Sequence, residues 1–352
     1  MSETVQDSVR VDELDLAIVD CLQLNPRAPW TLVGKALAVD PVTVARRWQR
    51  LTSTGTAWVT GRAAGHAGPE AGLAVIELSC TAGRTWPIAE RVAQLPHVLS
   101  IEHMSGPRAL SLLVEVRDLA FLSQFLLRSL GPIRGVIETR SHAVTRVHRM
   151  GDVWQLQMLD RHQRAIMTSQ LGQHTVKPGG AGGARGPYDE IDRRLILLLG
   201  EDGRMPVVDL AVRLGLSEGA VRRRLGELVR SSRVILRCDV ALPASSWSVI
   251  TWVWCQAPVD DPDTIAAIMR HAKGVRVCFQ VAGGQPNVLL ALNAPSLQET
   301  AAMEAALAAA APRLTILDRS MVLRSVKRMG RELDAAGRSI RTVPMDIWAD
   351  PD

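Results

Sequence analysis

Hydrophobic residues recur with helical spacing in residues 217–229, and arginines occupy much of the remaining surface of this segment. The apolar positions follow i, i+4 and i+7: Val221, Leu225 and Leu228. This spacing predicts an amphipathic helix, for which Ser217 is a suitable N-cap. Residues 208–214 predict a shorter helix before it, and Gly215 permits a tight turn between the two. The pattern predicts a helix-turn-helix whose second helix enters the DNA major groove; a basic helix in an ordinary bundle is the alternative.

The chain contains this pattern twice, at an offset of 177 residues. Asp-Glu-Leu-Asp at 12–15 reappears as Asp-Glu-Ile-Asp at 189–192. The matching positions also include arginines: Arg46 with Arg223, and Arg47 with Arg224. Three helices are predicted in the first copy, over 15–24, 31–37 and 42–52. The last of them begins with an Asp40 N-cap and Pro41 at the first helical position. The repeat indicates two copies of one structural unit, each with its own recognition helix.

After each helical head the apolar pattern changes to the alternation typical of strands. The first copy predicts strands over 73–78, 99–104, 109–116 and 136–147, with helices over 86–95 and 121–130. The second copy predicts strands over 248–256, 276–282, 288–294 and 315–326, with helices over 263–272 and 297–311. The order βαββαβ is that of ferredoxin-like folds. The predicted fold class is therefore α+β, with two winged helix-turn-helix heads, each followed by a ferredoxin-like domain.

These elements divide the chain into five segments. The helix-turn-helix domains are predicted over 10–62 and 188–240, and the ferredoxin-like regulatory domains over 72–150 and 247–330. Residues 151–187 are predicted to be a linker, in which 158–175 continue as a polar helix. Its end, 177–187, has the sequence KPGGAGGARGP, and this composition predicts a flexible tether.

Composition narrows the class of protein. The 352 residues include 41 Lys and Arg against 36 Asp and Glu, a net charge of +5, which permits a polyanionic partner such as double-stranded DNA. The five cysteines show no CxxC spacing and the eight histidines no HxxxH spacing, so we expect buried thiols, no metal site and no cofactor. The chain shows no signal peptide and no apolar run of about 18 residues. A cytoplasmic protein without a membrane partner is expected.

The two heads are LDLAIVDCLQLNPRAPWTLVGKALAVDPVTVARRWQRL and IDRRLILLLGEDGRMPVVDLAVRLGLSEGAVRRRLGEL. With the βαββαβ unit that follows each, the chain resembles the Lrp/AsnC (feast/famine) family of transcriptional regulators. The resemblance implies a sequence-specific DNA-binding regulator that forms a homo-oligomer and responds to an amino acid or related small metabolite. It places effector binding at the turn between the second and third strands of each domain. The residues there are Ser105, Gly106 and Arg108 in the first copy, and Gly283 and Gln285 in the second. Ala109 and Pro286 stand where the family commonly has aspartate.

The predicted DNA contacts lie on the two recognition helices. Thr43 and Ser217, near the helix N-termini, are expected to contact phosphate. Six arginines are expected to divide between the DNA backbone and base edges: Arg46, Arg47, Arg50, Arg222, Arg223 and Arg224. Two other classes remain open. One is an enzyme of the siroheme decarboxylase type on the same architecture, although its Arg-His cluster is not visible, and we expect no enzyme activity. The other is a protein-interaction module that has lost DNA binding.

The repeat also leaves the assembly open. Trp252 and Trp254 fall on one face of a strand, and packing at a sheet interface is predicted rather than a ligand cage. At the 177-residue offset they correspond to Val75 and Glu77, so the two sheet faces differ. The copies could pair within one chain as a pseudo-dimer, or equivalent copies of two chains could pair. A homodimer of pseudo-dimers is the favoured hypothesis.

Overall fold

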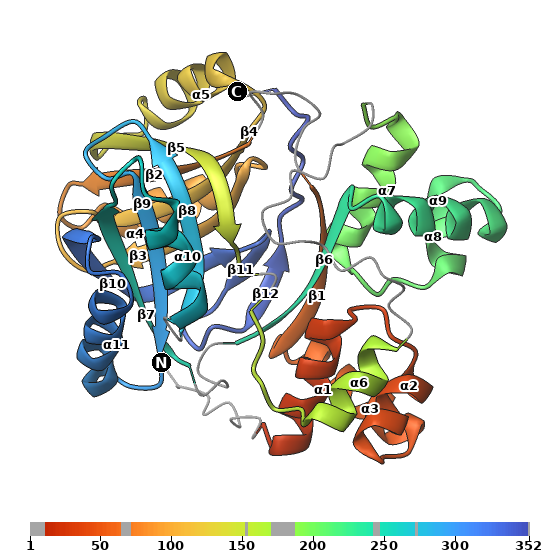
Figure 1. Ribbon diagram of the computed structural model, residues 1–352. Helices are drawn as coiled ribbons and strands as arrows, with labels where there is room; N and C mark the ends of the chain where they lie inside the picture. The colour runs from red at the N-terminus through yellow and green to blue at the C-terminus, as the bar shows by residue number, and fades with distance from the viewer. Residues whose placement is uncertain are drawn as a thin grey trace, which may run out of the picture.

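The structure is a computed structural model that describes residues 11–64, 72–151, 154–169, 187–241, 247–271 and 274–350. It confirms the α+β class. Figure 1 shows two helical heads on one flank of the molecule and a large sheet with covering helices on the other. In the described part of the chain, no helix is long and apolar enough to cross a membrane.

Each head consists of three helices and a strand. Head 1 contains α1 (Glu13–Leu24), α2 (Trp30–Leu37), α3 (Pro41–Ser53) and β1 (Ala57–Ala63). Head 2 contains α7 (Glu190–Glu201), α8 (Val207–Leu214), α9 (Glu218–Arg230) and β6 (Val234–Val240). The predicted caps are confirmed: the Asp40 carboxylate accepts the Val42 N–H at 2.9 Å, and the Ser217 hydroxyl accepts the Ala220 N–H at 3.3 Å. The predicted apolar faces are also buried: Val44, Trp48, Leu51, Val221, Leu225 and Leu228.

The turn before each recognition helix has a left-handed residue. Gly215 adopts φ +68° after α8, and Ala38 adopts φ +53° at the same place after α2. Alanine adopts this conformation at a higher energy than glycine because its Cβ crowds the following carbonyl. The second copy therefore has the residue that the turn favours, and the first keeps the same geometry without it.

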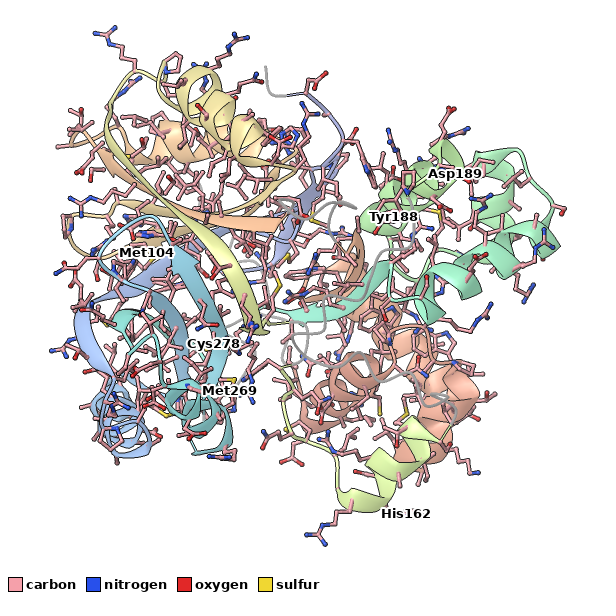
Figure 2. All side chains as sticks on the ribbon, turned by 45° about the horizontal axis from the view of Figure 1, so that its top comes forward. Met104, His162, Tyr188, Asp189, Met269 and Cys278 are labelled. Atoms are coloured by element: carbon pink, nitrogen blue, oxygen red, sulfur yellow. The ribbon has the colours of Figure 1, made fainter. Side chains whose placement is uncertain are left out.

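Part of the predicted linker 151–187 is folded against head 1. Helix α6 (Arg161–Thr168) begins at an Asp160 capping box and buries Met167 in the core of that head. His162 lies at its outer end (Figure 2). The Asp20 carboxylate, at the centre of α1, accepts the N–H groups of Met158 and Leu159 at 2.7 and 3.1 Å. The predicted glycine-rich tether lies, except for Pro187, outside the described residues.

The two βαββαβ halves form one closed sheet. The first half contains β2 (Gly72–Cys80), α4 (Thr85–Ala93), β3 (Val98–Met104), β4 (Leu110–Val116), α5 (Leu119–Gln124), η1 (Phe125–Leu130) and β5 (Val136–Arg149). The second contains β7 (Val249–Gln256), α10 (Pro262–His271), β8 (Val275–Ala282), β9 (Val288–Ala294), α11 (Leu297–Ala310) and β10 (Thr315–Arg328). The strand orders are β3-β4-β2-β5 and β8-β9-β7-β10, and the halves join where β5 pairs with β8 and β10 with β3.

Successive side chains of a strand point to opposite faces of the closed sheet, so they contribute to two different hydrophobic cores. On β2, Ala74, Ile76 and Leu78 pack under the helices of the first half, whereas Leu73 and Val75 face the interior of the closed sheet. Trp252 and Trp254 belong to this interior core, so the prediction that they pack at a sheet interface is confirmed. The five cysteines are free thiols, and the expectation of burial is wrong only for Cys80, which is half-buried.

Several boundaries differ from the expectation. The helix predicted over 121–130 begins at Leu119, and its second half is a π-helical turn. Both final strands run further than predicted, to Arg149 and Arg328. Beyond residue 330, where no element was predicted, β11 (Arg331–Leu333) and β12 (Ser339–Thr342) extend the sheet next to β10.

β12 and the segment after it join the closed sheet to both heads. Ser339 donates its N–H to the Gly55 carbonyl of head 1 at 2.8 Å. Ile347 packs in the core of head 2, and the Trp348 ring meets Tyr188 edge-on with centroids 5.4 Å apart. On the closed sheet, His97 Nε2 lies 2.8 Å from the Ala349 carbonyl oxygen. The heads are thus held in place by a C-terminal segment outside the repeat.

The two copies pair within the chain around a pseudo-two-fold axis. In the antiparallel pair β1–β6, Thr60 lies opposite Arg237, its own counterpart at the 177-residue offset. Arg27 donates to the carbonyls of Gly203 and Met205 at 2.7 and 2.9 Å, and its counterpart Arg204 donates to the carbonyls of Pro26 and Ala28 at 2.7 and 2.9 Å. This exchange fixes one head against the other. Burial, with the nearby Arg27 charge, lowers the pKa of Arg204 to about 10.

We expect the double variant Arg27→Ala, Arg204→Ala to loosen the joint between the heads. It removes four hydrogen bonds from charged donors, each contributing about 1.5–3 kcal/mol. Amide hydrogen exchange in β1 and β6 should become at least about tenfold faster, because local opening becomes less costly. Arg128→Ala, at an exposed arginine of η1, is the control. Unchanged exchange in β1 and β6 of the double variant would show that the arginines do not hold the heads together.

Candidate nucleic-acid interface

The exposed faces of α3 and α9 carry one arginine at equivalent positions. Arg46 and Arg223 are both exposed, and among the described residues neither forms an ion pair. On the same face of α3, Gln49 is exposed and Val42 is 75% exposed. Each recognition helix therefore offers a guanidinium that is available to bind an anionic or acceptor-rich partner.

Two of the predicted DNA-contacting arginines are held inside their own heads. Arg47 donates to the Asp12 and Asp15 carboxylates at 2.6 and 3.1 Å. In head 2, Arg224 donates to Asp189 and Asp192 at 2.6 and 2.7 Å; Asp189 lies at the start of α7 (Figure 2). These hydrogen bonds raise the pKa of both arginines. The geometry assigns Arg47 and Arg224 to joining the first helix of each head to the recognition helix.

The sequence contained a signal for this role. In both copies an aspartate pair precedes the arginine by 35 and 32 residues, at 12, 15 and 47 and again at 189, 192 and 224. Because both copies keep the two aspartates and the arginine at the same spacing, the three side chains are expected to contact one another within each head. This contact was missed because arginines on a recognition helix were assigned to DNA as a group.

The remaining predicted residues lie around the same two helices. Arg50 forms an ion pair with buried Asp15, whereas Arg222 forms a weaker one with Glu218 at 3.4 Å. Thr43 is half-buried in the first turn of α3, and its N–H donates to Asp40 at 3.4 Å. Ser217 is the N-cap of α9. All eight predicted residues are thus brought to the two recognition helices, but only some present a side chain outward.

The two recognition surfaces are not identical. Arg50 in head 1 corresponds to Glu227 in head 2, and Gln49 corresponds to Gly226. Arg233, on the turn after α9, approaches Asp192 at 3.4 Å and so takes the place that Arg50 has beside Asp15. Head 2 keeps the internal charge pairing, but α9 has an acidic residue in place of Arg50 and gains Arg222 and Arg230 in place of Ala45 and Ser53. The two surfaces would therefore contact a partner differently.

The turn with the first predicted effector residues packs on the other half. Ser105 exchanges hydrogen bonds with Met321 of β10, at 2.8 and 2.9 Å. Arg108 forms ion pairs with Glu77 and Asp318, and its guanidinium lies 4.3 Å from the Trp254 ring centroid. Gly106 is exposed, with φ +83°. The Arg108 guanidinium is therefore already occupied by contacts within the chain.

The second turn packs on the first half in the same way. A Cβ at Gly283, where φ is +103°, would lie 2.7 Å from the Ser141 carbonyl oxygen of β5, so this position requires glycine. Gln285 is exposed. The neighbouring His142 is buried, with Nε2 lying 3.0 Å from the Glu77 carboxylate. Both predicted effector sites thus lie where the halves meet.

Among the described residues, no group of three or more His, Cys, Asp or Glu side chains could hold a metal ion.

Comparison with protein families supports the two-copy organisation. Residues 11–52 and 189–229 each match the family model described as the AsnC-type helix-turn-helix domain. Residues 73–153 match the model described as the Lrp/AsnC ligand binding domain.

Related proteins match a length of this chain that corresponds to about one copy or less. The chain is 34% identical over 105 residues to the HTH-type transcriptional regulator LrpA of Mycobacterium tuberculosis, covering 29% of this chain and 69% of that protein. It is 29% identical over 147 residues to an uncharacterized HTH-type transcriptional regulator of Pyrococcus abyssi, covering 41% of this chain and 91% of that protein.

Among solved structures, the siroheme decarboxylase NirDL has a similar fold over nearly the whole chain. The TM-score is 0.55 at 14% sequence identity, covering 90% of this chain and 93% of NirDL. The same enzyme in co-complex with an iron-uroporphyrin III analogue gives 0.57 at 13% identity, covering 96% of each chain. At this identity the likeness concerns the fold alone.

Proposed function

Because this chain belongs to the Lrp/AsnC family of transcriptional regulators, we propose that it is a sequence-specific DNA-binding regulator in which one chain supplies both reading heads. The observation that carries the proposal is the pair Arg46 and Arg223, exposed at equivalent positions of two recognition helices. The reciprocal contacts of Arg27 and Arg204 support it, because they fix the spacing of the two heads. A fixed spacing is what recognition of two half-sites requires.

The proposed operator has two unequal half-sites. The recognition helices differ at Arg50 and Glu227 and at Gln49 and Gly226, so their contacts with base edges would differ. The regulatory part is a pair of tandem ferredoxin-like domains that form a pseudo-dimer. We propose that these pseudo-dimers assemble further into a homo-oligomer, as symmetric regulators commonly do.

The regulatory half is proposed to respond to an amino acid or related small metabolite. The match of residues 73–153 to a ligand-binding domain supports this response. The turns at Gly106 and Gly283 stay the predicted effector site. Because Arg108 is bound to Glu77 and Asp318, an effector there would rely on the backbone and exposed side chains of the turns, such as Gln285.

Selection of binding sites from fragmented genomic DNA, followed by footprinting and mass measurement, tests the function. The expected result is a protected asymmetric site bound by one 38.3 kDa chain per pair of half-sites, with affinity that falls steeply with salt. Protection of a perfectly symmetric short site would contradict the single-chain reader. Equal affinity for all sequences would contradict specific recognition.

The enzyme alternative requires a tetrapyrrole site. The cavity inside the closed sheet has a volume of about 70 Å³, room for about five waters, which is too small for a porphyrin. A larger hollow of about 450 Å³ lies beside α7 and α9, but no histidine among the described residues lines it. Incubation with iron uroporphyrin should therefore leave the Soret band of the free porphyrin unshifted. A stoichiometric shift would instead favour the enzyme class.

A further inference from the structure

The interior of the closed sheet contains a cavity of about 70 Å³ beside three buried arginines. Arg237, Arg276 and Arg328 line it, with exposed fractions of 5%, 9% and 6%. They come from β6, β8 and β10, so that a head strand and two strands of the closed sheet meet there. The cavity therefore lies at the joint between the heads and the regulatory part.

Two of these arginines, Arg276 and Arg328, lack a close carboxylate partner among the described residues. Arg237 donates to Asp239 at 2.6 Å, but the Asp239 carboxylate comes no closer than 3.6 Å to Arg276, which is too far for a hydrogen bond. Arg328 donates to the hydroxyl of Ser325 at 3.0 Å. Glu102 accepts the indole N–H of Trp252. Among the described residues, no carboxylate therefore lies within hydrogen-bond distance of Arg276 or Arg328.

The pKa shifts of these groups reflect their burial. Burial and the nearby charges of Arg328 and Arg237 lower the pKa of Arg276 to about 9. Burial also raises the pKa of Glu102, which reduces the negative charge available to the arginines. A buried cation with incomplete pairing is stabilised by an additional anion.

We propose that this cavity binds a small organic monocarboxylate, whose anionic group contacts Arg276 and Arg328 and whose apolar part packs against Trp252 and Phe279. The two guanidinium groups of Arg276 and Arg328, which have no described carboxylate at hydrogen-bond distance, suit a single carboxylate. The apolar side chains in the lining suit a hydrocarbon body: Val75, Leu113, Ile250, Phe279 and Ala291. At about 10–15 Å³ per water, the cavity has room for about five waters, or a ligand of about six non-hydrogen atoms.

The interior cavity is separate from the predicted turn sites, since none of the turn residues lines it. Arg237 also lies opposite Thr60 at the centre of the strand pair that joins the heads. A ligand held there would change the charge environment of this joint. The consequence for DNA rests on the proposed function: any effect of the carboxylate on DNA affinity must equal the effect of DNA on carboxylate affinity.

Calorimetric and thermal-shift titration of the full chain with isobutyrate tests the site. Isobutyramide has the same shape as isobutyrate but no charge, so it serves as the control ligand. Inorganic phosphate at equal ionic strength tests for a general anion site. Saturable binding of isobutyrate, on the order of millimolar as its size allows, is expected, with no binding of isobutyramide. Arg276→Gln and Arg328→Gln should each weaken it by about tenfold to a hundredfold, whereas Arg270→Gln, at an exposed arginine of α10, should not.

Other outcomes overturn the proposal. Equal binding of the acid and the amide, or no binding of the acid, excludes recognition of a carboxylate, and this comparison needs no variant that has to fold. Binding that survives Arg276→Gln and Arg328→Gln but is lost in Gln285→Ala places the acid at the turns. Tighter binding of phosphate than of isobutyrate identifies a general anion site. These measurements contain no DNA, so they stand whether or not the chain proves to be a regulator.

Discussion

Arg46→Ala and Arg223→Ala should each weaken operator binding by about 1–3 kcal/mol, the contribution of a good contact to a base edge. The two side chains are exposed at equivalent positions of α3 and α9, whereas Arg47 and Arg224 are bound to aspartates of their own heads. The double variant should lose most of its preference for the operator and keep part of its non-specific affinity. Electrophoretic mobility shift with operator and scrambled DNA at fixed salt measures both quantities.

Two further variants separate DNA contact from head stability. Arg91→Ala removes an exposed arginine of α4 in the regulatory part and should leave operator affinity unchanged. Arg47→Ala should lower the melting temperature, because it leaves buried Asp15 with one partner fewer. Unchanged operator affinity in both Arg46→Ala and Arg223→Ala would contradict the assignment of these two residues. An equal loss on operator and scrambled DNA would show that they contact phosphate rather than bases.

Glu77→Ala should destabilise the chain by about 3–5 kcal/mol, the usual cost of removing one partner from a buried charged network. Glu77 is 2% exposed and accepts from Arg108, His142 and the indole of Trp254. Trp254 is the counterpart of Glu77 at the 177-residue offset. The contact therefore lies on the pseudo-two-fold axis, and its loss weakens the pairing of the two halves. Urea unfolding followed by tryptophan fluorescence measures the change.

Glu138→Ala is the matched control for Glu77→Ala. Glu138 lies on the neighbouring strand β5 and also forms an ion pair with an arginine, Arg140 at 2.8 Å, but both side chains are about half exposed. Its removal should cost no more than about 1 kcal/mol. Similar losses in the two variants would show that the buried network adds nothing beyond a surface ion pair.

The same network predicts how stability depends on pH. Burial opposes ionisation of Glu77, but hydrogen bonding to His142 and the charge of Arg108 together lower its pKa below the ordinary 4.5. A carboxyl with a lowered folded-state pKa contributes stability that is complete above the unfolded-state pKa. This contribution is lost as pH falls through the folded-state pKa. The free energy of unfolding should thus fall below about pH 4.5, less steeply in Glu77→Ala; equal slopes would contradict the shift.

If the first halves of two chains paired with each other, and the second halves likewise, identical residues would meet on this axis. Two copies of Glu77 would meet without the Trp254 indole, and two copies of Trp254 would meet without a carboxylate acceptor. A buried pair of like charges is unfavourable, so the unequal halves favour each other. The divergence of Glu77 and Trp254 explains physically why pairing within one chain is preferred.

Local spacing in the sequence was enough to predict the recognition helices of both heads and, to within a few residues, the strands and helices of the βαββαβ halves. Caps such as Asp40 and Ser217 and stripes such as Val221, Leu225 and Leu228 depend on neighbours within one or two turns. The repeat at 177 residues further indicated that each feature has a counterpart. The short strands β11 and β12 escaped this reasoning because three or four residues are too few to show alternation.

Only the tertiary structure decided what the charged residues do. Arg47 meets Asp12 from 35 residues away, and Arg108 meets Asp318 from 210 residues away. The repeated spacing of Asp12, Asp15 and Arg47 in the second copy hints at the first pair, but nothing in the sequence marks the second, because it depends on how the two halves pack after they form. The sequence alone therefore determined which surfaces are basic, whereas packing decided which arginines stabilise the fold and which, like Arg46 and Arg223, remain available for a partner.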